Sequence, residues 1–565
     1  MGRHTRREFL QTTTALGGAL LLAEASRAKD GLRPPTEGPN IVLILTDDQG
    51  YGDLGRHGNP HLKTPNLDRL HDTSVRFERF YVCPVCSPTR AGLMTGRYNY
   101  RTGAIDTYLG RSMMYSDEVT LAEILVEHGY RAGIFGKWHL GDNYPMRPMD
   151  QGFQESLVHR GGGLCQPSDW PGNSYFDPIL SRNGKDEKTS GYCTDVFTDA
   201  ALRFIEENRN RPFFVYLATN APHTPLEIGE EWAAPYRAAG LPDDLAKVYG
   251  MIANIDANIG RLLDRLQEWS LDENTLVFFI TDNGPQGSRQ GVRWNAGMRA
   301  AKGSVYEGGI RVPCFVRWTG QLEPGRVVDR IAANIDILPT VVDLVGLTSP
   351  PDLHLDGRSL APLLRDPASE WPNRNLFFQW HRGDTPELFR DCAVRDQRYK
   401  LVNGTELYDI QNDPGEQHDM AAEDPDRVSA MRAAYERWFR DVGATRGYAP
   451  PRIHVGSPHE NPATLTRQDW RGANGWGDKD LGYWEIWVSL EGPYDITARF
   501  TPRPRPGTLH VRVGTVHAEQ PVEKNAGEGV FRGMRLSRGD GRLEAWIEDD
   551  EGSVGVHQID VEHVG

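Results

Sequence analysis

Two acidic pairs, Asp47-Asp48 and Asp282-Asn283, each stand directly after a run of apolar and β-branched residues. Such uninterrupted runs are typical of buried strands in a parallel sheet. Sites in open α/β sheets form at the carboxyl ends of strands, so we expect the four side chains to meet there. Crowded carboxylates need a compensating cation, and oxygen ligands suit Ca²⁺ or Mg²⁺. Helix capping is the alternative interpretation of each pair taken alone.

Cys86 begins a segment with the pattern Cys-x-Pro-x-Arg. Ser87 is a suitable N-cap and Pro88 suits the first position of a short helix. Cys86 would then lie at a helix N-terminus, where free N–H groups and the dipole favour an anion, and Arg90 would add a fixed positive charge. The alternatives are a buried, chemically inert cysteine beside a cap, or a redox pair with Cys83.

Basic side chains lie in loop-like segments that follow other predicted strands or stand beside an acidic pair. They are Lys137, His139, His223 and Lys302. A lone Lys or His in a loop is usually only solvated. Several of them near Arg90 would offset the charge of an anionic substrate and would supply protons to a leaving group.

The elements that must position these residues are visible as apolar patterns. Thr120 and Glu123 form a capping box, followed by an apolar helix face that ends at Gly129. Residues 245–266 carry apolar side chains at spacings of three and four, as in a long amphipathic helix. Helices that alternate with strands predict an α/β domain whose mostly parallel sheet is covered on both faces. The expected strands are 41–46, 130–135, 213–217 and 276–281.

The pattern changes twice along the chain. We predict a first α/β domain over 38–384, a smaller α+β subdomain over 385–448 and a C-terminal β-sandwich over 460–565. The sandwich is expected either to contact carbohydrate or simply to pack against the first domain.

Composition narrows the class of partner. The 565 residues carry a net charge of −15, which argues against nucleic-acid binding by general electrostatics. An anionic substrate would need positive charge gathered locally. Six cysteines in this length do not make a disulfide scaffold, although Cys165 and Cys193 are candidates for one pair.

The first 28 residues have the features of a twin-arginine signal peptide. Arg6-Arg7 precedes an apolar stretch over 12–22 and an Ala-x-Ala-like cleavage site at 23–25. An uncleaved membrane anchor is the alternative, but the stretch is short for a bilayer crossing. We expect a bacterial protein exported in folded form by the twin-arginine machinery, periplasmic or secreted, without a stable membrane span.

Taken together, the motifs resemble the type I, formylglycine-dependent sulfatases, and the chain is arylsulfatase-like. The resemblance extends over roughly 38–440 and leaves the C-terminal segment unassigned. The matching segments, in the family's order, are 47–53, 64–68, 86–97, 136–141, 221–225, 281–284, 307–313, 338–340, 356–360 and 406–409.

The resemblance implies an alkaline-phosphatase-like fold and hydrolysis of sulfate esters. It implies that a formylglycine-generating enzyme converts Cys86 to formylglycine (3-oxoalanine). Ca²⁺, with Mg²⁺ as the alternative, would be held by the modified Cys86 and by Asp47, Asp48, Asp282 and Asn283.

The resemblance also implies roles for the basic residues. His223 and Lys302 would bind sulfate and protonate the leaving alcohol. His139 would deprotonate the second hydroxyl of the aldehyde hydrate, and Lys137 and Arg90 would hold the hydrate. Asp282 would take up the proton of the attacking hydroxyl.

The substrate expected is a sulfated polysaccharide or oligosaccharide. Candidate contacts come from the loops 159–163, 170–183 and 286–299, with His159, Arg160 and Trp294 as the residues proposed. Two other functions stay open. One is a phosphonate monoester or phosphodiester hydrolase on the same scaffold, and the other is a non-catalytic protein that binds sulfated glycans.

Overall fold

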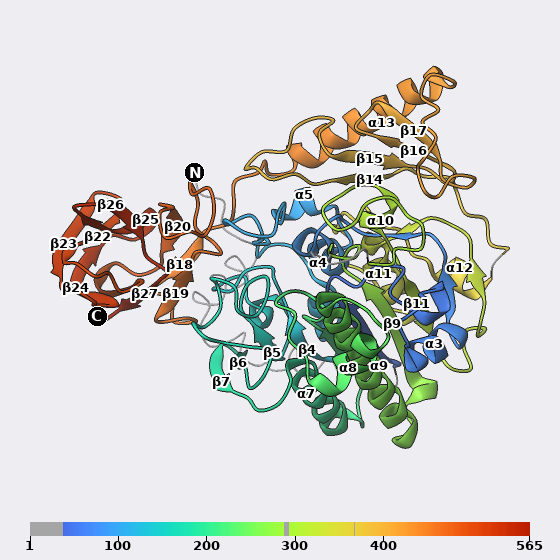
Figure 1. Cartoon of the computed structure of the whole chain (residues 1–565), viewed down its shortest axis with the longest axis horizontal. Helices are drawn as coiled ribbons and strands as arrows, with labels where there is room; N and C mark the ends of the chain where they lie inside the picture. Colours follow the sequence, from blue (N-terminus) through green and yellow to red (C-terminus); the bar gives the residue numbers. More distant parts are fainter. Residues whose placement is uncertain (1–37, 288–292, 367) are drawn as a thin grey trace, which may run out of the picture.

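The computed structural model describes residues 38–287, 293–366 and 368–565, so the predicted signal peptide lies outside it. Its centre is a ten-stranded sheet in which β9, β1, β8, β4 and β5 run parallel, and antiparallel strands join at both edges (Figure 1). In spatial order the strands are β12 (Val327–Val328), β2 (Val75–Phe77), β11 (Cys314–Arg317), β9 (Thr275–Thr281), β1 (Asn40–Thr46), β8 (Phe213–Ala218), β4 (Arg131–Lys137), β5 (Glu155–His159), β6 (Ile179–Arg182) and β7 (Lys185–Lys188).

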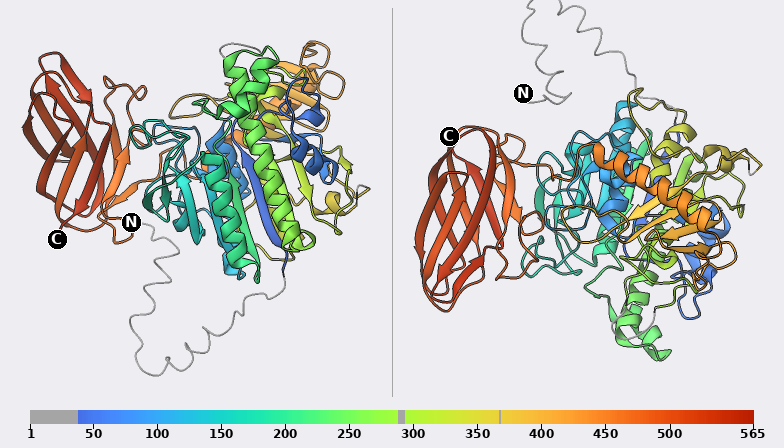
Figure 2. Two further views of the ribbon diagram at one scale, coloured as in Figure 1. Left: turned by 60° about the horizontal axis from the view of Figure 1, so that its bottom comes forward. Right: turned by 90° about the horizontal axis from the view of Figure 1, so that it is seen from above.

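Helices cover both faces of this sheet because β1 is apolar on both sides. Val42 and Ile44 pack with α7 (Cys193–Asn208) and α9 (Asp243–Glu268), which lie side by side over one face (Figure 2). Ile41, Leu43 and Leu45 belong to the core on the other face. That core also takes in α4 (Cys86–Thr95), α6 (Leu121–Glu127), α11 (Ile337–Leu344) and α12 (Ala361–Arg365).

Several predicted element boundaries are close to the observed ones. The capping box of Thr120 and Glu123 is present at the start of α6, and α9 (Asp243–Glu268) spans the predicted helical segment 245–266. The remaining helices of the α/β domain are short: α3 (Pro65–Asp72), α5 (Asn99–Thr102), α8 (Glu230–Ala238) and α10 (Glu307–Ile310). A three-stranded sheet joins β10 (Arg311–Val312), β3 (Phe80–Tyr81) and β13 (Ala332–Ala333).

The smaller subdomain is a four-stranded antiparallel sheet with α13 (Pro425–Ala444) packed on it. This sheet begins with β14, upstream of residue 385 where the sequence pattern changes. Its strands are β14 (Leu376–Gln379), β15 (Cys392–Arg395), β16 (Tyr399–Val402) and β17 (Glu406–Asp409).

The C-terminal segment forms two further sheets that enclose a second core beside the α/β domain (Figure 1), and Leu109, Met113 and Met146 of that domain pack into it. The α/β fold with a smaller α+β subdomain and an added sandwich is therefore confirmed. One sheet contains β18 (Ile453–Val455), β20 (Tyr483–Val488), β25 (Gly539–Asp549), β22 (Gly507–Val513), β23 (Val516–Val522) and β26 (Gly552–Gly555); the other contains β19 (Ala463–Thr466), β27 (Gln558–His563), β21 (Gly492–Arg499) and β24 (Glu528–Leu536).

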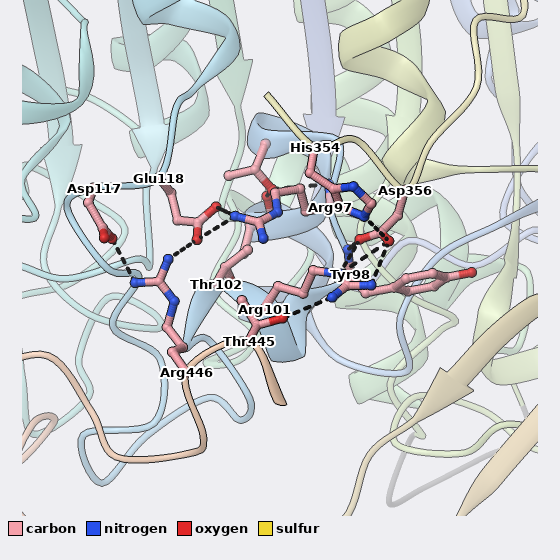
Figure 3. Close-up of polar contacts among 12 residues, drawn as sticks. Arg97, Tyr98, Arg101, Thr102, Asp117, Glu118, His354, Asp356, Thr445 and Arg446 are labelled. Carbon is pink, nitrogen blue, oxygen red and sulfur yellow. Dashed lines mark hydrogen bonds and ion pairs between the residues drawn. The ribbon is translucent and has the colours of Figure 1, made fainter. Parts of the chain in front are cut away.

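An ion-pair network fastens the segment after α13 to the α/β domain (Figure 3). Glu118, whose side chain is fully buried, accepts hydrogen bonds from Arg97 and from Arg446. Arg101 pairs with Asp356 at 2.9 Å in the same region. The chain thus leaves the smaller subdomain along a fixed path toward the sandwich.

Two further sequence expectations concern cysteines and membranes. Cys165 and Cys193 are both free thiols in this structure, so the suggested pair is not formed. Across the described ranges, no helix has both the length and the apolar content needed to cross a bilayer.

Candidate active site

The two acidic pairs meet at the carboxyl ends of adjacent parallel strands. β1 pairs with β9 in register, with Thr46 opposite Thr281, so the residues that follow lie side by side. The Asp48 amide donates to Asp282 Oδ1 at 3.1 Å, and Asn283 Nδ2 donates to Asp48 Oδ1 at 2.8 Å. All four acidic-pair residues are buried, so their charges face one another instead of water.

Three cationic groups from separate elements surround the carboxylates. Lys137, the last residue of β4, places Nζ 2.5 Å from Asp47 Oδ2. Lys302 Nζ lies 2.6 Å from Asp48 Oδ1. Arg90 on α4 donates to Asp282 Oδ2 at 2.7 Å and to the Lys137 carbonyl at 2.8 Å. Each carboxylate thus has at least one cationic partner, and Arg90 also approaches Asp47 at 3.9 Å, which meets the condition for burying charge at tolerable cost.

Cys86 is the first residue of α4 and lies among these charges. Its sulfur belongs to a cluster with carboxylate oxygens of Asp47 and Asp282 in which all three ligand atoms lie within 4.8 Å of one another. The predicted helix is present, but the predicted cap is wrong. Val85 is the N-cap and gives no side-chain bond, while Ser87 Oγ donates instead to the Ser112 carbonyl at 3.0 Å. The first turn therefore keeps its N–H groups free of side-chain capping.

Two histidines complete the set. His139 Nε2 lies 2.7 Å from the Thr107 carbonyl, which requires a proton on Nε2, and its buried Nδ1 has no hydrogen-bond partner. His223 Nδ1 lies 2.6 Å from the Thr224 carbonyl, and its Nε2 faces Asp48 Oδ2 at 3.8 Å. His139 thus presents a free ring nitrogen that can accept a proton.

Burial and neighbouring charges set the protonation states. Burial, with Lys302, lowers the pKa of His223 to about 3, despite the opposing effect of Asp48. It also lowers the pKa of His139, again helped by a neighbouring lysine. Both imidazoles are therefore neutral, and the 3.8 Å approach of His223 to Asp48 is not an ion pair. Burial raises the pKa of the Cys86 thiol, so the unmodified side chain is not a thiolate at neutral pH.

The carboxylates are not equivalent. Burial opposes ionisation of Asp48, but the charge of Lys302 outweighs it, helped by hydrogen bonds from Lys302 and Asn283, and lowers its pKa. Burial and the adjacent Asp47 raise the pKa of Asp282 to about 6, against the opposing effect of Arg90. Asp282 thus accepts a proton more readily than Asp48.

The arrangement offers buried oxygen atoms of the kind that bind a hard cation. Asp47 Oδ1, Asp48 Oδ2 and Asn283 Oδ1 are buried and lack any hydrogen-bond partner. Unsatisfied buried oxygens are costly, and a divalent ion that prefers oxygen ligands would satisfy them. The donor chemistry therefore fits Ca²⁺ or Mg²⁺.

A cavity of about 530 Å³ opens over this group. Cys86, His139, His223 and Lys302 line it, whereas His159, Arg160 and Trp294 do not. His159 is buried beneath the site, where burial lowers its pKa to about 3. Arg160 instead pairs with Asp186 at 3.0 Å and stacks over Trp170, and Trp294 is exposed elsewhere.

Sequence reasoning missed several residues at or beside this cavity, among them four with aromatic or charged side chains and one glutamine. Tyr108, Trp380, Arg382 and Trp476 line it, and Gln468 lies 3.4 Å from His139 Nε2. The one available signal was Trp476 between two glycines, because an aromatic residue in a flexible turn is often a ligand contact. The long separations along the chain gave no indication of their meeting.

Comparison with known families agrees with the site. The family model described as "Sulfatase" matches residues 39–347, and the model described as "N-sulphoglucosamine sulphohydrolase, C-terminal" matches residues 300–436. The chain belongs to the sulfatase family and is a sulfuric ester hydrolase. Neither model extends into the sandwich.

Relatives and solved structures support the same assignment. Human arylsulfatase A is 33% identical over 455 residues, covering 70% of this chain and 86% of the relative. Human N-acetylgalactosamine-6-sulfatase is 34% identical over 376 residues, covering 61% and 69%. The structure of Ps i-CgsB in complex with k-i-k-neocarrahexaose aligns with a TM-score of 0.66 at 30% identity, covering 73% of this chain and 95% of that one.

Proposed function

We propose that this chain hydrolyses sulfate monoesters on a sulfated polysaccharide or oligosaccharide, with Cys86 converted to formylglycine as the nucleophilic group. The observation that carries the proposal is the position of Cys86. Its sulfur lies at the base of the cavity, at a helix N-terminus, within the cluster of Asp47 and Asp282. A buried, protonated thiol would be a poor nucleophile in this position.

Asp47, Asp48, Asp282 and Asn283 would hold the divalent cation, with modified Cys86 beside them. Calcium is the ion we favour and magnesium is the alternative. The bound ion would supply positive charge that polarises the sulfate ester and orients the nucleophile.

The aldehyde hydrate of formylglycine supplies the hydroxyl groups needed for attack on sulfur and for product release. Lys137 and Arg90 would hold the hydrate, which is supported by their ion pairs with Asp47 and Asp282, the two carboxylates that cluster with Cys86. Asp282, whose carboxylate lies in the cluster with Cys86, takes up a proton on attack. His139, through its free Nδ1, removes the proton that allows release.

Lys302 and His223 lie on the cavity side, where they bind the sulfate group and protonate the leaving alcohol. Burial opposes protonation of Lys302, but Asp48 outweighs it and raises its pKa, so its ammonium is charged. A bound sulfate would raise the pKa of the neighbouring His223 and favour its charged form.

The structural neighbour bound to k-i-k-neocarrahexaose supports a saccharide substrate. The cavity supports it too, because it is larger than a sulfate ion requires and is lined partly by aromatic side chains. Twin-arginine export to the periplasm or the exterior would bring the enzyme to such polymers, and modification of Cys86 would precede folded export.

The competing activity is hydrolysis of phosphonate monoesters or phosphodiesters. The phosphonate monoester hydrolase of Agrobacterium radiobacter aligns at 25% identity with a TM-score of 0.52, covering 72% of this chain and 95% of that one. Matched assays with aryl sulfate, aryl phosphonate and aryl phosphodiester under one metal concentration separate the two, and we expect the sulfate to have the highest kcat/KM.

The central test is Cys86→Ser, in a host whose formylglycine-generating enzyme accepts cysteine alone. We expect intact-mass analysis to show the aldehyde in the wild-type chain, and turnover of aryl sulfate to fall at least about a thousandfold in the variant. Cys83→Ser is the matched control, because Cys83 is buried three residues away and does not line the cavity. Full multiple turnover by Cys86→Ser would refute the mechanism.

A further inference from the structure

The mouth of the cavity is built from three separate parts of the chain. Tyr108 comes from the loop after α5, Trp380 and Arg382 follow β14 of the smaller subdomain, and Trp476 lies in the loop between β19 and β20 of the sandwich. Cys86 lies at the base of the same cavity. The sandwich therefore contributes a wall of the active-site cavity, besides packing against the α/β domain.

The sandwich is held against the catalytic loop by buried polar contacts. Gln468 Nε2 donates to the Thr107 carbonyl at 2.8 Å and to Ser112 Oγ at 3.0 Å. Arg471 donates to the Leu109 carbonyl at 3.1 Å. These contacts flank Tyr108 and hold its loop, and the Trp476 carbonyl accepts a hydrogen bond from Arg467 at 2.6 Å, so both sides of the wall are held in place.

The side chains at the mouth form a cluster of aromatic rings and one guanidinium. The rings of Tyr108 and Trp476 are 4.9 Å apart at 79°, an edge-to-face pair. The Arg382 guanidinium lies 4.3 Å from the Tyr108 ring and 5.0 Å from the Trp380 ring. Aromatic faces beside a polar cavity suit the C–H faces of a sugar ring, which is apolar on its faces and polar at its rim.

Positive charge exceeds negative charge around the mouth. Arg382 and Arg111 approach Asp106 at 2.6 and 3.5 Å, and Arg111 and Arg471 approach Asp384 at 3.5 and 3.0 Å. Three guanidinium groups thus share two carboxylates. The Arg382 side chain is 50% exposed, so its charge is accessible to a ligand. An excess of cations is unexpected on a chain of net charge −15 and favours an anionic ligand.

We propose that Tyr108, Trp380, Arg382 and Trp476 form a second sugar subsite, which binds a ring carrying an anionic group next to the ring whose sulfate is cleaved. The inference rests on the proposed saccharide sulfatase function and deepens it. The preferred substrate has at least two sugar residues and at least two anionic groups. The second anion is a sulfate or a carboxylate, because Arg382 can pair with either.

The test compares substrates of two sizes on the full, modified and metal-loaded chain. One is 4-nitrophenyl sulfate, which reaches only the catalytic residues. The other is the best substrate in a panel of carrageenan, chondroitin sulfate and heparan sulfate oligosaccharides, which together offer sulfate and carboxylate neighbours. We expect Trp476→Ala and Arg382→Gln to raise KM for that oligosaccharide at least about tenfold and to leave aryl sulfate kcat and KM within about twofold.

Two further variants distinguish a binding role from a structural one. Trp476→Phe keeps an aromatic face, so its KM for the oligosaccharide should be close to the wild-type value. Trp546→Ala removes a tryptophan that stacks with His510 and His517 in the same sandwich and does not line the cavity. It should leave kcat and KM unchanged for both substrates.

The possible results separate the two proposals. If Trp476→Ala and Arg382→Gln lose kcat/KM equally on both substrates, or leave the oligosaccharide KM unchanged, the subsite proposal is wrong. The sulfatase activity would still be established. Turnover of aryl sulfate with no turnover of any oligosaccharide would also overturn it. Failure of the modified wild-type chain on every sulfate ester would overturn the proposed function itself, and the subsite with it.

Discussion

Charge balance explains how an acidic protein can bind an anionic group at its centre. Arg90, Lys137 and Lys302 match the three carboxylates of the site, so the group is neutral without a metal. A divalent cation would then make it net positive. Asp48 and His139 also adopt left-handed backbone conformations, with φ of 61° and 60°, which non-glycine residues seldom do. Such strain concentrates at functional sites, where surrounding contacts maintain it.

Metal removal should therefore abolish activity and lower stability. Without an ion, Asp47 Oδ1, Asp48 Oδ2 and Asn283 Oδ1 are buried without hydrogen-bond partners, which costs free energy. We expect chelator treatment to reduce aryl sulfate turnover at least about a hundredfold and to lower the melting temperature. Binding of added metal ion should restore both the turnover and the melting temperature. Readdition of Ca²⁺ and of Mg²⁺ in separate titrations identifies the better ion. An unchanged melting temperature and full activity after verified metal removal would contradict the assignment.

Gln468 is predicted to be a positioning residue for His139. Both side chains donate to the Thr107 carbonyl, at 2.8 and 2.7 Å, so Gln468 helps to fix the acceptor that sets the His139 tautomer. Gln468→Leu should lower kcat for aryl sulfate about tenfold with little change in KM. Gln520→Leu, at a half-buried position on the same sandwich, is the matched control. A loss that appears only in thermal stability would indicate a purely structural role.

Local patterns were sufficient to predict the strands, the long helices and the gathering of strand-end residues. Parallel strands end at the same edge of a sheet, so the positions of Asp47 and Asp282 follow from two apolar runs. The cap of α4 could not be predicted in the same way. Ser87 has the right residue type, but its hydroxyl donates to the Ser112 carbonyl, a tertiary contact that no local pattern encodes.

The cavity mouth shows the same limit more clearly. Tyr108 and Trp476 meet across a separation of 368 residues in different folding units. The predicted loops 159–163 and 286–299 do reach the cavity through Gly162, Gln286 and Gly287, but Arg160 stacks over Trp170 instead, and Trp294 does not line the cavity. Residue type and loop position are thus weak guides to specificity contacts, because the packing of whole units decides which loops converge.

The loop before α6 and the segment after α13 depend on one buried carboxylate. Glu118 accepts hydrogen bonds from Arg97 at 2.8 Å and Arg446 at 2.5 Å, as Figure 3 shows. Glu118→Ala would leave two cations close together without their shared partner. We expect a loss of about 3 kcal/mol in the free energy of unfolding, measured by denaturant titration.

Asp117→Ala is the control for this substitution. Asp117 also pairs with Arg446, at 2.7 Å, but its side chain is 55% exposed, so we expect a loss of no more than about 1 kcal/mol. Neither substitution touches the cavity, and aryl sulfate turnover at low temperature should be unchanged in both. Equal stability of the two variants would show that burial of Glu118 does not strengthen the network.

The joint between the sandwich and the α/β domain contains a second buried acid. Glu460 Oε2 accepts from the Tyr144 amide at 2.8 Å, and Arg147 lies 3.7 Å from Oε1. Burial, with Asp150 nearby, raises the pKa of Glu460 to about 7, although Arg147 opposes it. The window runs from the ordinary pKa of a glutamate in the unfolded chain up to about pH 7. Within it, the folded chain keeps the proton on Glu460 and the unfolded chain releases it. Stability from this group is present at low pH and is lost as pH rises through that window.

Glu460→Gln should remove this pH dependence, because the amide keeps the shape and the acceptor without a charge. Near pH 8 we expect the variant to be more stable than the wild type, with a free energy of unfolding higher by on the order of 2 kcal/mol. Near pH 5 the two should agree, since Glu460 is then protonated in the folded chain. Glu562→Gln, at an exposed position on β27, controls for the loss of one surface charge. Parallel stability curves for wild type and Glu460→Gln across this range would show that Glu460 is ionised in the folded joint, and that Arg147 compensates its burial.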